Sequence, residues 1–585
     1  MRRSDFSITI SFRHQLHGRK DCLTIPFACG RGSVLISPSR RTSVATSAGS
    51  GVSLMLDGEL YVCDVLDRRR QAEIALEAYL STGREEFARS LNGTFVLVIV
   101  DGRKDAVLVI TDRLGFRKVF FRRIQGDVHL ASSPSLVPAD GIDPVGALTY
   151  LSNGFIFSAR TVRAQVRALE KAAIHKIARS EISSSRYWRY DLRGAEGDVE
   201  EDTASLECAA HMREAVARRI PSGGGRIFVS LSGGIDSRAV LGCVLDAVDD
   251  RRRIVSFSYG APTDEDVVIA QKVARYVGVE HRNMELTSDL ESIIRNNAAL
   301  GEGLVGFYTH GIEALIRLAS DFSDDDVLFV GETVVTRGLE SFTDRDDVLI
   351  RGVEIRSPMK VPPYFSYGKY RARDLQEVID RDMAELKSRI SHMSNLQDLR
   401  DFLFLEQRTC NMLLPWREFL AGRFITVCNP FLDNALLDFY RSCPRRFRFD
   451  KRLHRVATQR MFPDLCRLGF AASSGVENSA VHGQIGSKYS SLERLVKGFP
   501  SDLDALIPPA VVSSALCDAY QSVRLDGTKM PRPFRLLLDN VRRRRLKRKL
   551  SRNIHSEGGL LSPPSLGPEQ MERLLTLRVL LARQE

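Results

Sequence analysis

Residues 228–242, FVSLSGGIDSRAVLG, decide the fold of this 585-residue chain. The stretch begins with the β-branched and aromatic residues of a short buried strand, and it ends with apolar residues at helical spacing. Between them lie two glycines, two hydroxyl side chains and one carboxylate, namely Ser232, Gly233, Gly234, Asp236 and Ser237. The pattern predicts a strand, a tight turn and a helix in direct succession.

The predicted turn has the composition of a phosphate-binding site. It is expected at the carboxyl end of a parallel strand, where open α/β sheets bind their ligands. Gly233 and Gly234 let the backbone approach a ligand, and the N–H groups at the start of the helix favour an anion. A carboxylate beside phosphates requires a divalent cation, so Asp236 is predicted to hold Mg²⁺. The alternative is an ordinary turn in which Asp236 and Ser237 only cap the helix.

The rest of the chain divides by its periodicity. Strands and helices alternate after the turn, which predicts βαβ units and a parallel sheet, hence an α/β domain. Residues 52–138 form short β-rich segments separated by Asp-Gly and similar turns, which predict an α+β domain. The Ser/Thr/Arg-rich residues 37–51 are expected to form a loop. Three segments are therefore expected: a front domain over 1–190, an α/β domain over 191–500, and a basic helical extension over 501–585.

Composition excludes several classes of protein. No run of 18 apolar residues appears, so no membrane span is expected. The ten cysteines form no C-x-x-C pair, which argues against a zinc site or a disulfide framework and fits a reducing cytoplasm. Much of the net charge of +11 lies in residues 541–553, VRRRRLKRKLSRN. No aromatic residues are interleaved there for base stacking, so we expect a solvated helix rather than a nucleic-acid site.

Several segments carry a family resemblance. Residues 231–238, LSGGIDSR, resemble the pyrophosphate loop of ATP-pyrophosphatase enzymes, which bind ATP and release pyrophosphate as an acyl adenylate forms. Later segments resemble asparagine synthetases: IVSFSYGAPTDEDVV from 254, LFVGETVVTRG from 328 and CNPFLDNALLDFYRS from 428. The front segments LDGELY, LNGTFVLVIVDG, DRLGFRKVFF and LASSPSLV resemble the glutaminase domain of the same family.

The resemblance implies a fold, cofactors and site residues. The fold is an adenine nucleotide alpha hydrolase-like synthetase domain with a parallel sheet, behind an N-terminal α+β glutaminase-like domain of the Ntn type. ATP and Mg²⁺ are the cofactors, with the five turn residues on the phosphates. Ser256 and Gly260 would line the adenine pocket through backbone groups, Gly331 and Glu332 would form a second active-site loop, and Lys451 would face the pyrophosphate.

Two positions depart from the family pattern. Val335 stands where relatives carry a second magnesium-binding acid, which leaves Glu332 or Glu340 for that role, or a metal with fewer protein ligands. Ala471 stands where relatives carry a second lysine that stabilises the transition state. Arg467 or Lys488 could supply that cation instead, although Arg is not equivalent to Lys.

The front domain is expected to be an inactive glutaminase. The family's glutaminase needs a cysteine at its mature N-terminus, whereas residue 2 is Arg and the first cysteine is Cys22. We therefore expect an amine that belongs to the substrate, as in β-lactam synthetases and lasso peptide cyclases. Arg238 after the loop and the length of the chain are more similar to the cyclases. Thr426 and Cys428 replace the Glu and Arg that grip small zwitterions, which favours a larger substrate.

A lasso peptide cyclase adenylates an Asp or Glu side chain of a precursor peptide, which the peptide's own N-terminal amine then attacks. This resemblance implies a leader-free core peptide as the substrate, with a leader peptidase and a leader-recognition protein as partners. The alternatives are a β-lactam synthetase, an ammonia-dependent amide ligase, and a non-catalytic module whose ATP site has decayed.

Four further residues are expected to be structural. His281 is expected to be a polar residue between a helix and a strand. Asp112 and Arg113 are expected to form a buried ion pair that holds the hairpins of the front domain. Trp188 is expected to anchor the packing between domains.

Overall fold

The structure, a computed structural model, describes residues 5–12, 16, 21–27, 32–61, 67–82, 84–192, 199–284, 290–304, 309–335, 341–355, 361, 371–472, 489–498, 500–526 and 568–582. The basic cluster at 541–553, Glu340 and Lys488 lie outside these residues. None of the helices in the described ranges combines the length and the hydropathy needed to cross a bilayer.

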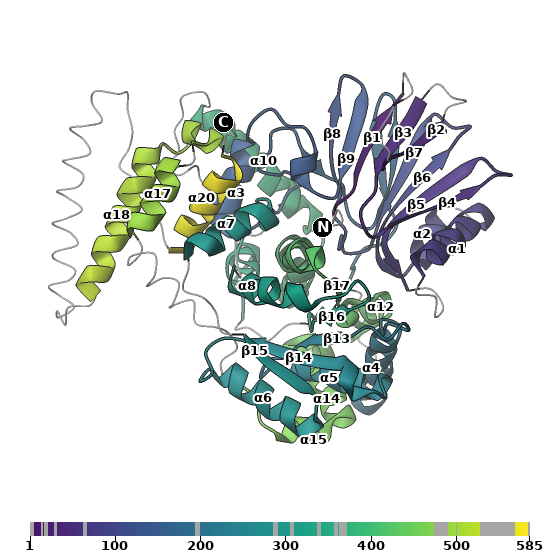
Figure 1. Ribbon diagram of the computed structural model, residues 1–585, viewed down its shortest axis with the longest axis vertical. Helices are drawn as coiled ribbons and strands as arrows, with labels where there is room; N and C mark the ends of the chain where they lie inside the picture. Colours follow the sequence, from purple (N-terminus) through teal and green to yellow (C-terminus); the bar gives the residue numbers. More distant parts are fainter. Residues whose placement is uncertain are drawn as a thin grey trace.

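Two six-stranded antiparallel sheets form the front domain, at the upper right of Figure 1. The first has the order β10-β8-β9-β1-β3-β2, with β1 (Ser7–Ser11), β2 (Leu23–Phe27), β3 (Gly32–Ser37), β8 (Phe120–Ile124), β9 (Asp127–Ala131) and β10 (Arg167–Ala168). The second has the order β12-β11-β7-β6-β5-β4, with β4 (Thr42–Ser47), β5 (Val52–Leu60), β6 (Gly93–Asp101), β7 (Ala106–Thr111), β11 (Ala173–Ala178) and β12 (Ile182–Arg186). The predicted α+β front domain is confirmed.

Alternating side chains hold these layers together. Val96 and Val98 of β6 face a core between the two sheets, which also contains Ile8 of β1. Leu97 and Ile99 of the same strand face the other way, into a core shared with α1 (Arg68–Ser81) and α2 (Arg84–Ser90). This period of two is typical of a strand that is buried on both faces.

Two expectations about the front domain are wrong. The predicted loop over 37–51 contains β4, which pairs with β5 because its small and β-branched residues suit an edge strand. The predicted ion pair between Asp112 and Arg113 does not form. Asp112 accepts hydrogen bonds from backbone N–H groups of its own turn, whereas Arg113 reaches across the domain boundary to Asp438, 2.7 Å away.

The predicted parallel sheet is also confirmed. Its order is β15-β14-β13-β16-β17, and every neighbouring pair is parallel. The strands are β13 (Ile227–Ser230), β14 (Ile254–Tyr259), β15 (Glu280–Met284), β16 (Val327–Phe329) and β17 (Thr426–Cys428). Helices around it include α4 (Glu201–Ala217), α5 (Ile235–Ala247), α6 (Glu265–Val277), α12 (Asn434–Ser442), α13 (Arg445–Arg448), α14 (Arg452–Met461) and α15 (Pro463–Arg467). Because β13 lies in the centre, the turn that follows it is at the middle of the sheet edge.

A helical core joins segments from all three predicted domains. Its helices are α3 (Pro144–Asn153), α7 (Leu290–Gly301), α10 (Ala372–Arg389), α11 (Leu396–Leu403), α17 (Tyr489–Gly498), α18 (Pro509–Asp526) and α20 (Pro568–Leu580). Helix α8 (Thr309–Leu318) packs instead against the parallel sheet, and the short helix α9 (Arg345–Asp347) has no buried residue. Leu151 of α3, Ile294 of α7 and Leu575 of α20 are buried in one cluster. Figure 1 shows α20 beside α3 and α7, so the end of the chain packs against its front half.

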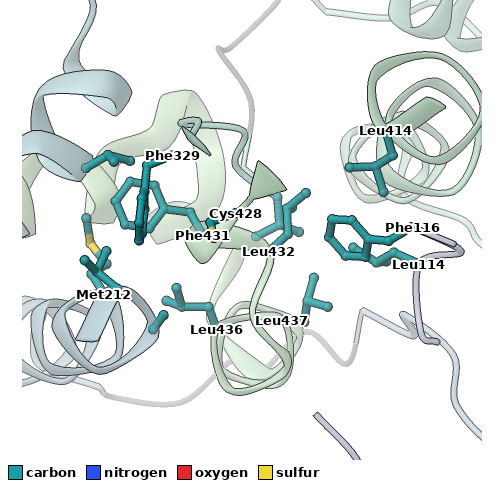
Figure 2. Packing of buried hydrophobic residues seen from close by; sticks show 14 of the residues in the cluster. Leu114, Phe116, Met212, Phe329, Leu414, Cys428, Phe431, Leu432, Leu436 and Leu437 are labelled. Carbon is teal, nitrogen blue, oxygen red and sulfur yellow. The ribbon is translucent and has the colours of Figure 1, made fainter. Parts of the chain in front are cut away.

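The front domain and the parallel-sheet domain share an apolar core. Leu114 and Phe116 of the front domain lie beside Leu432 and Leu437, as Figure 2 shows. Trp188 donates from Nε1 to Asp438, 3.0 Å away, while the Arg113 guanidinium lies over its ring. The prediction that Trp188 anchors the packing between domains is therefore confirmed.

Candidate functional site

The turn after β13 has the predicted strand–turn–helix geometry. Its two serines shape the backbone: Ser237 Oγ accepts from the Ser232 N–H at 3.1 Å, and Ser232 Oγ accepts from the Gly234 N–H at 3.2 Å. Helix α5 begins directly after Gly234, so the positive end of a 13-residue helix lies at the turn. The arrangement presents helix-start N–H groups to an anion.

Contacts from two other segments fix Gly233 in place. Its N–H donates to Asp266 Oδ1 at 2.8 Å, and its carbonyl accepts from the Ala471 N–H at 3.2 Å. A Cβ on Gly233 would lie 2.7 Å from the Ala471 Cβ, so no larger residue fits without movement. The position at which relatives carry a second lysine is thus in contact with the turn, but in this chain it holds Ala471 and no cation.

Asp236 lies in the first turn of α5 between two basic side chains. Lys451 Nζ is 2.6 Å from its Oδ2, and His454 Nε2 is 3.2 Å from its Oδ1. Burial alone would raise the pKa of Asp236, but the charges of Lys451 and His454 outweigh it and hold the pKa well below its usual range. Asp236 is therefore an anion at neutral pH. His454 Nε2 lies beside Oδ1 without hydrogen-bond geometry, and no other described residue donates to this oxygen.

A single carboxylate oxygen of this kind fits Mg²⁺. Magnesium often uses only one or two carboxylates and completes its coordination with water and substrate phosphates. Among the described residues, no group of three or more His, Cys, Asp or Glu side chains has the geometry of a metal centre. The Asp236 carboxylate suits a cation whose remaining ligands are phosphates and water.

The loop after β16 also touches the turn. A Cβ on Gly331 would lie 3.0 Å from the backbone of Asp236 and Ser237, so this loop packs directly on the start of α5. Glu332 beside it forms an ion pair with Arg417 at 2.6 Å. Val335 is 3% exposed in an apolar core, so it contributes no metal ligand.

The other predicted site residues lie as follows. Arg467 extends into solvent and pairs with Asp464 at 2.6 Å. Gly260 has a φ of +141°, and a Cβ there would lie 2.5 Å from Asp264 Oδ2.

Ser256 is fully buried and contacts His281. Its Oγ lies 2.9 Å from His281 Nδ1. Ser258 holds the other ring nitrogen at 3.0 Å, and burial lowers the pKa of His281 to about 4. His281 is therefore a neutral, structural side chain, as predicted.

Two residues contribute to the site in roles that the sequence did not predict. His454 lies three residues after Lys451, on the same face at the start of α14, and this spacing is the sequence signal that could have identified it. Arg238 is fully buried and donates to the carbonyls of Gly233 and Leu465 at 3.3 and 2.9 Å. It also stacks on Phe470, so it holds the turn to the segment that precedes Ala471.

The front domain presents no reactive cysteine near its buried charges within the described residues. Cys22 precedes the edge strand β2 and contacts Ser37 Oγ at 3.1 Å. Asp57, in the segment similar to the glutaminase family, is buried in a hydrogen-bonded ion pair with Arg117. The loss of glutaminase chemistry stays a prediction.

Comparison with known families identifies two parts of the chain. Residues 64–188 match the glutamine amidotransferase domain, and residues 207–327 match asparagine synthase. Two parts of the chain are therefore similar to these two domains, and the turn after β13 lies inside the second match. The fold agrees with both matches, because the first lies in the antiparallel sheets and the second in the parallel sheet.

Relatives are distant. The glutamine-hydrolyzing asparagine synthetase of Mesocricetus auratus is 25% identical over 307 residues, covering 48% of this chain and 52% of its own length. The amidase chyE of Penicillium rubens is 23% identical over 304 residues, covering 45% and 43%. The chain thus spans about half the length of the curated relatives it matches. The glutamine phosphoribosylpyrophosphate amidotransferase from B. subtilis, a solved structure, covers 48% of this chain and 65% of its own, with 11% identity and a TM-score of 0.23.

Proposed function

We propose that the chain is an ATP-dependent amide ligase that adenylates a carboxylate at the turn after β13. The observation that carries this proposal is the convergence of Asp236, Lys451 and the start of α5 on one turn. The match of this region to asparagine synthase supports the same reaction class.

The reaction has two balanced steps. A carboxylate oxygen of the substrate attacks the α-phosphorus of ATP, and the bond to pyrophosphate breaks. An amine nitrogen then attacks the acyl carbon, the bond to AMP breaks, and the ammonium proton passes to solvent. The products are an amide, AMP and pyrophosphate.

Residues of this chain have distinct tasks in that reaction. The helix-start N–H groups, Ser232 and Ser237 orient the phosphates, while Asp236 Oδ1 would hold Mg²⁺. That ion supplies charge neutralisation at the phosphates. Lys451, which pairs with Asp236, offsets negative charge on the departing pyrophosphate.

The finer proposal is a lasso peptide cyclase. An Asp or Glu side chain of a leader-free precursor peptide is activated, and the peptide's N-terminal amine closes a macrolactam. Support for this reading comes from the sequence resemblance, since Thr426 and Cys428 line a cavity with Glu59 and Arg219 rather than the turn after β13. Holding both reacting groups on one molecule can remove several kcal/mol of the barrier, at best about 7–11.

Two protein partners follow from that chemistry. The attacking amine must first be released by proteolysis, so a leader peptidase is needed upstream. A protein that recognises the leader would bring the precursor to the peptidase.

The test is conversion of a leader-free candidate peptide with ATP and Mg²⁺, followed by mass spectrometry and pyrophosphate release. We expect loss of one water from the peptide and one pyrophosphate for each ring. Asp236→Ala should reduce turnover at least about 100-fold with an unchanged circular dichroism spectrum, whereas the exposed Asp250→Ala should keep full activity. Turnover by Asp236→Ala at the native rate would remove the assignment.

The same assay separates the other functions. An ammonia-dependent ligase would need ammonium salts and a small acid, and a β-lactam synthetase would accept a small β-amino acid. A binding module would show no ATP–pyrophosphate exchange with any of these substrates, and that outcome would contradict the proposal.

A further inference from the structure

Lys451 reaches the turn after β13 from a short connection whose backbone is unusual. The connection joins α13 to α14, and two successive residues in it, Asp450 and Lys451, lie in the left-handed region with φ of +51° and +57°. Residues that carry a Cβ atom adopt this region rarely, because the Cβ approaches the following carbonyl oxygen. Two such residues in succession indicate a backbone conformation that the surrounding structure imposes.

Buried side chains on both sides of the connection hold its ends. Arg448, at the end of α13, is 1% exposed and donates to Asp398 at 2.7 Å and to Asp401 at 3.0 Å. Leu453, in the first turn of α14, is fully buried in the apolar core that the two domains share. Because only residues 449–452 separate these two side chains, the backbone has little freedom in how it turns between them.

The side chain of Asp450 does not explain this conformation. It is 42% exposed, and its ion pair with Arg455, at 3.3 Å, is exposed to a similar degree. Ion pairs at such exposed positions contribute little to stability. Asp and Asn do, however, tolerate left-handed backbone better than other residues that carry a Cβ atom. We therefore look for the contribution of Asp450 in its backbone.

The connection directs Lys451 at Asp236. Lys451 Nζ lies 2.6 Å from Asp236 Oδ2, although the two residues are 215 positions apart in the sequence. The backbone of each residue has two freely rotating bonds, and rotation about those of Asp450 changes the direction in which Lys451 leaves the chain. The Lys451 side chain is 16% exposed, so its surroundings restrict other paths to the same carboxylate.

We propose that Asp450 is a positioning residue: its left-handed backbone, rather than its carboxylate, places the Lys451 ammonium at the phosphate-binding turn. This inference rests on the proposed function, in which Lys451 offsets negative charge on pyrophosphate. Backbone strain of this kind is typical of functional sites, where it holds a group in place before the ligand binds.

The first test measures the binding of inorganic pyrophosphate with Mg²⁺ by calorimetry. Glycine and asparagine accept left-handed backbone, so Asp450→Gly and Asp450→Asn should keep the native Kd within about twofold. Asp450→Val should raise the Kd at least about fivefold, and Asp450→Ala should raise it by an intermediate factor. Lys451→Met should also raise the Kd at least about fivefold. Adding Asp450→Val to Lys451→Met should raise it no further, because both changes remove the same ammonium from the site.

Two controls separate this effect from strain elsewhere and from charge. Gln125→Val imposes the same kind of strain at the exposed turn between β8 and β9, where φ is also +51°, and should leave the Kd unchanged. Arg455→Met removes the ion partner of Asp450 without altering the left-handed backbone, and should leave the Kd unchanged as well. Circular dichroism checks the folding of each variant, and Asp450→Ala takes the place of Asp450→Val if valine prevents folding.

A second measurement requires no phosphate ligand. A double-mutant cycle of Lys451→Met and Asp236→Asn in denaturant unfolding measures the coupling between these two side chains. We expect coupling of at least about threefold in the unfolding equilibrium constant with Asp450 and with Asp450→Asn, and none with Asp450→Val.

Three results would overturn the role of Asp450. Native Kd and native coupling in Asp450→Val would show that the backbone does not matter, and equal losses in Asp450→Asn and Asp450→Val would assign the effect to the carboxylate. Additive losses from Asp450→Val and Lys451→Met would show that the effect does not act through Lys451. If the native chain binds no pyrophosphate but the coupling still depends on position 450, the positioning is supported and the proposed phosphate site is contradicted.

Discussion

At the scale of single residues, Asp112 is a buried carboxylate whose titration should be visible in stability. The side chain is 1% exposed and accepts hydrogen bonds from the N–H groups of Leu114, Phe116 and Arg117. Burial nevertheless dominates and raises its pKa to about 6. An aspartate in the unfolded chain titrates near pH 4. Folding therefore takes up a proton between about pH 4 and 6, and this group's contribution to stability falls as pH rises through that window.

We predict that Asp112→Asn removes this dependence. Relative to the native chain, the variant should gain up to about 3 kcal/mol of unfolding free energy between pH 4 and 7. The measurement is the denaturant midpoint of the variant and of the native chain at each pH. Plotted against pH, the two curves should converge or cross across this range. The exposed Glu181→Gln should retain the native slope, and parallel curves for Asp112→Asn and the native chain would contradict the pKa assigned to this group.

Membership of the candidate site was predictable for residues that lie together in one short segment. Ser232, Gly233 and Asp236 lie within five residues of one another, so their spacing alone predicted that they share one turn. The three-residue spacing of His454 from Lys451 was the available signal, but the contact of His454 with Asp236 also depends on how α14 docks against α5. The ion pair between Glu332 and Arg417 was not predictable either, because Arg417 lies 85 residues away on a π-helix.

At the scale of elements, the turn and the segment around Ala471 behave as one packed unit. A methyl group on Gly233 would meet the Ala471 Cβ at 2.7 Å and Asp266 Oδ1 at 3.0 Å. Gly233→Ala should therefore push this segment away and break the hydrogen bond from the Ala471 N–H to the Gly233 carbonyl. We expect at least a tenfold increase in the Kd for ATP, measured by calorimetry, with little change in melting temperature.

The matched control for this change is Gly49→Ala, because nothing lies within 4 Å of a Cβ at Gly49. It should bind ATP like the native chain. Native ATP affinity in Gly233→Ala would show that the contact with Ala471 does not shape the turn.

Element types were predictable where periodicity is strong. The short β-rich run that forms β6 and the strand-to-helix change at Gly234 were both readable in the sequence. Strand β4 was not, because Thr42–Ser47 is rich in Ser and Thr, and its pairing with β5 overrides that composition.

At the scale of the whole molecule, the sequence predicted the α/β half and the α+β half. It did not predict how the two halves pack together. The helical core combines Leu151, Ile294 and Leu575, which are hundreds of residues apart and separately look like ordinary amphipathic positions. Only the packed chain shows that the segment 568–582 completes a core begun by α3.

Buried charges also join the two halves of the molecule. Arg41 of the front domain is 4% exposed and donates to Glu418 at 3.3 Å and to the carbonyls of Gly422 and Ile425 at 3.0 Å. Glu418 is buried as well, and burial raises its pKa despite the nearby charges of Arg41 and Arg117. Removal of Arg41 would leave the Glu418 carboxylate buried at this interface with less nearby positive charge to stabilise it.

We predict that Arg41→Met destabilises the protein by about 3–5 kcal/mol, because it breaks a buried ion pair from one side. Thermal unfolding would show the loss, while Arg69→Met, which removes an exposed partner of Glu73, should cost at most about 1 kcal/mol. Adding Glu418→Gln to Arg41→Met should recover part of the stability, since the amide carries no charge to bury. If the double variant is no more stable than Arg41→Met, the loss comes from the orphaned carbonyls rather than from the charge.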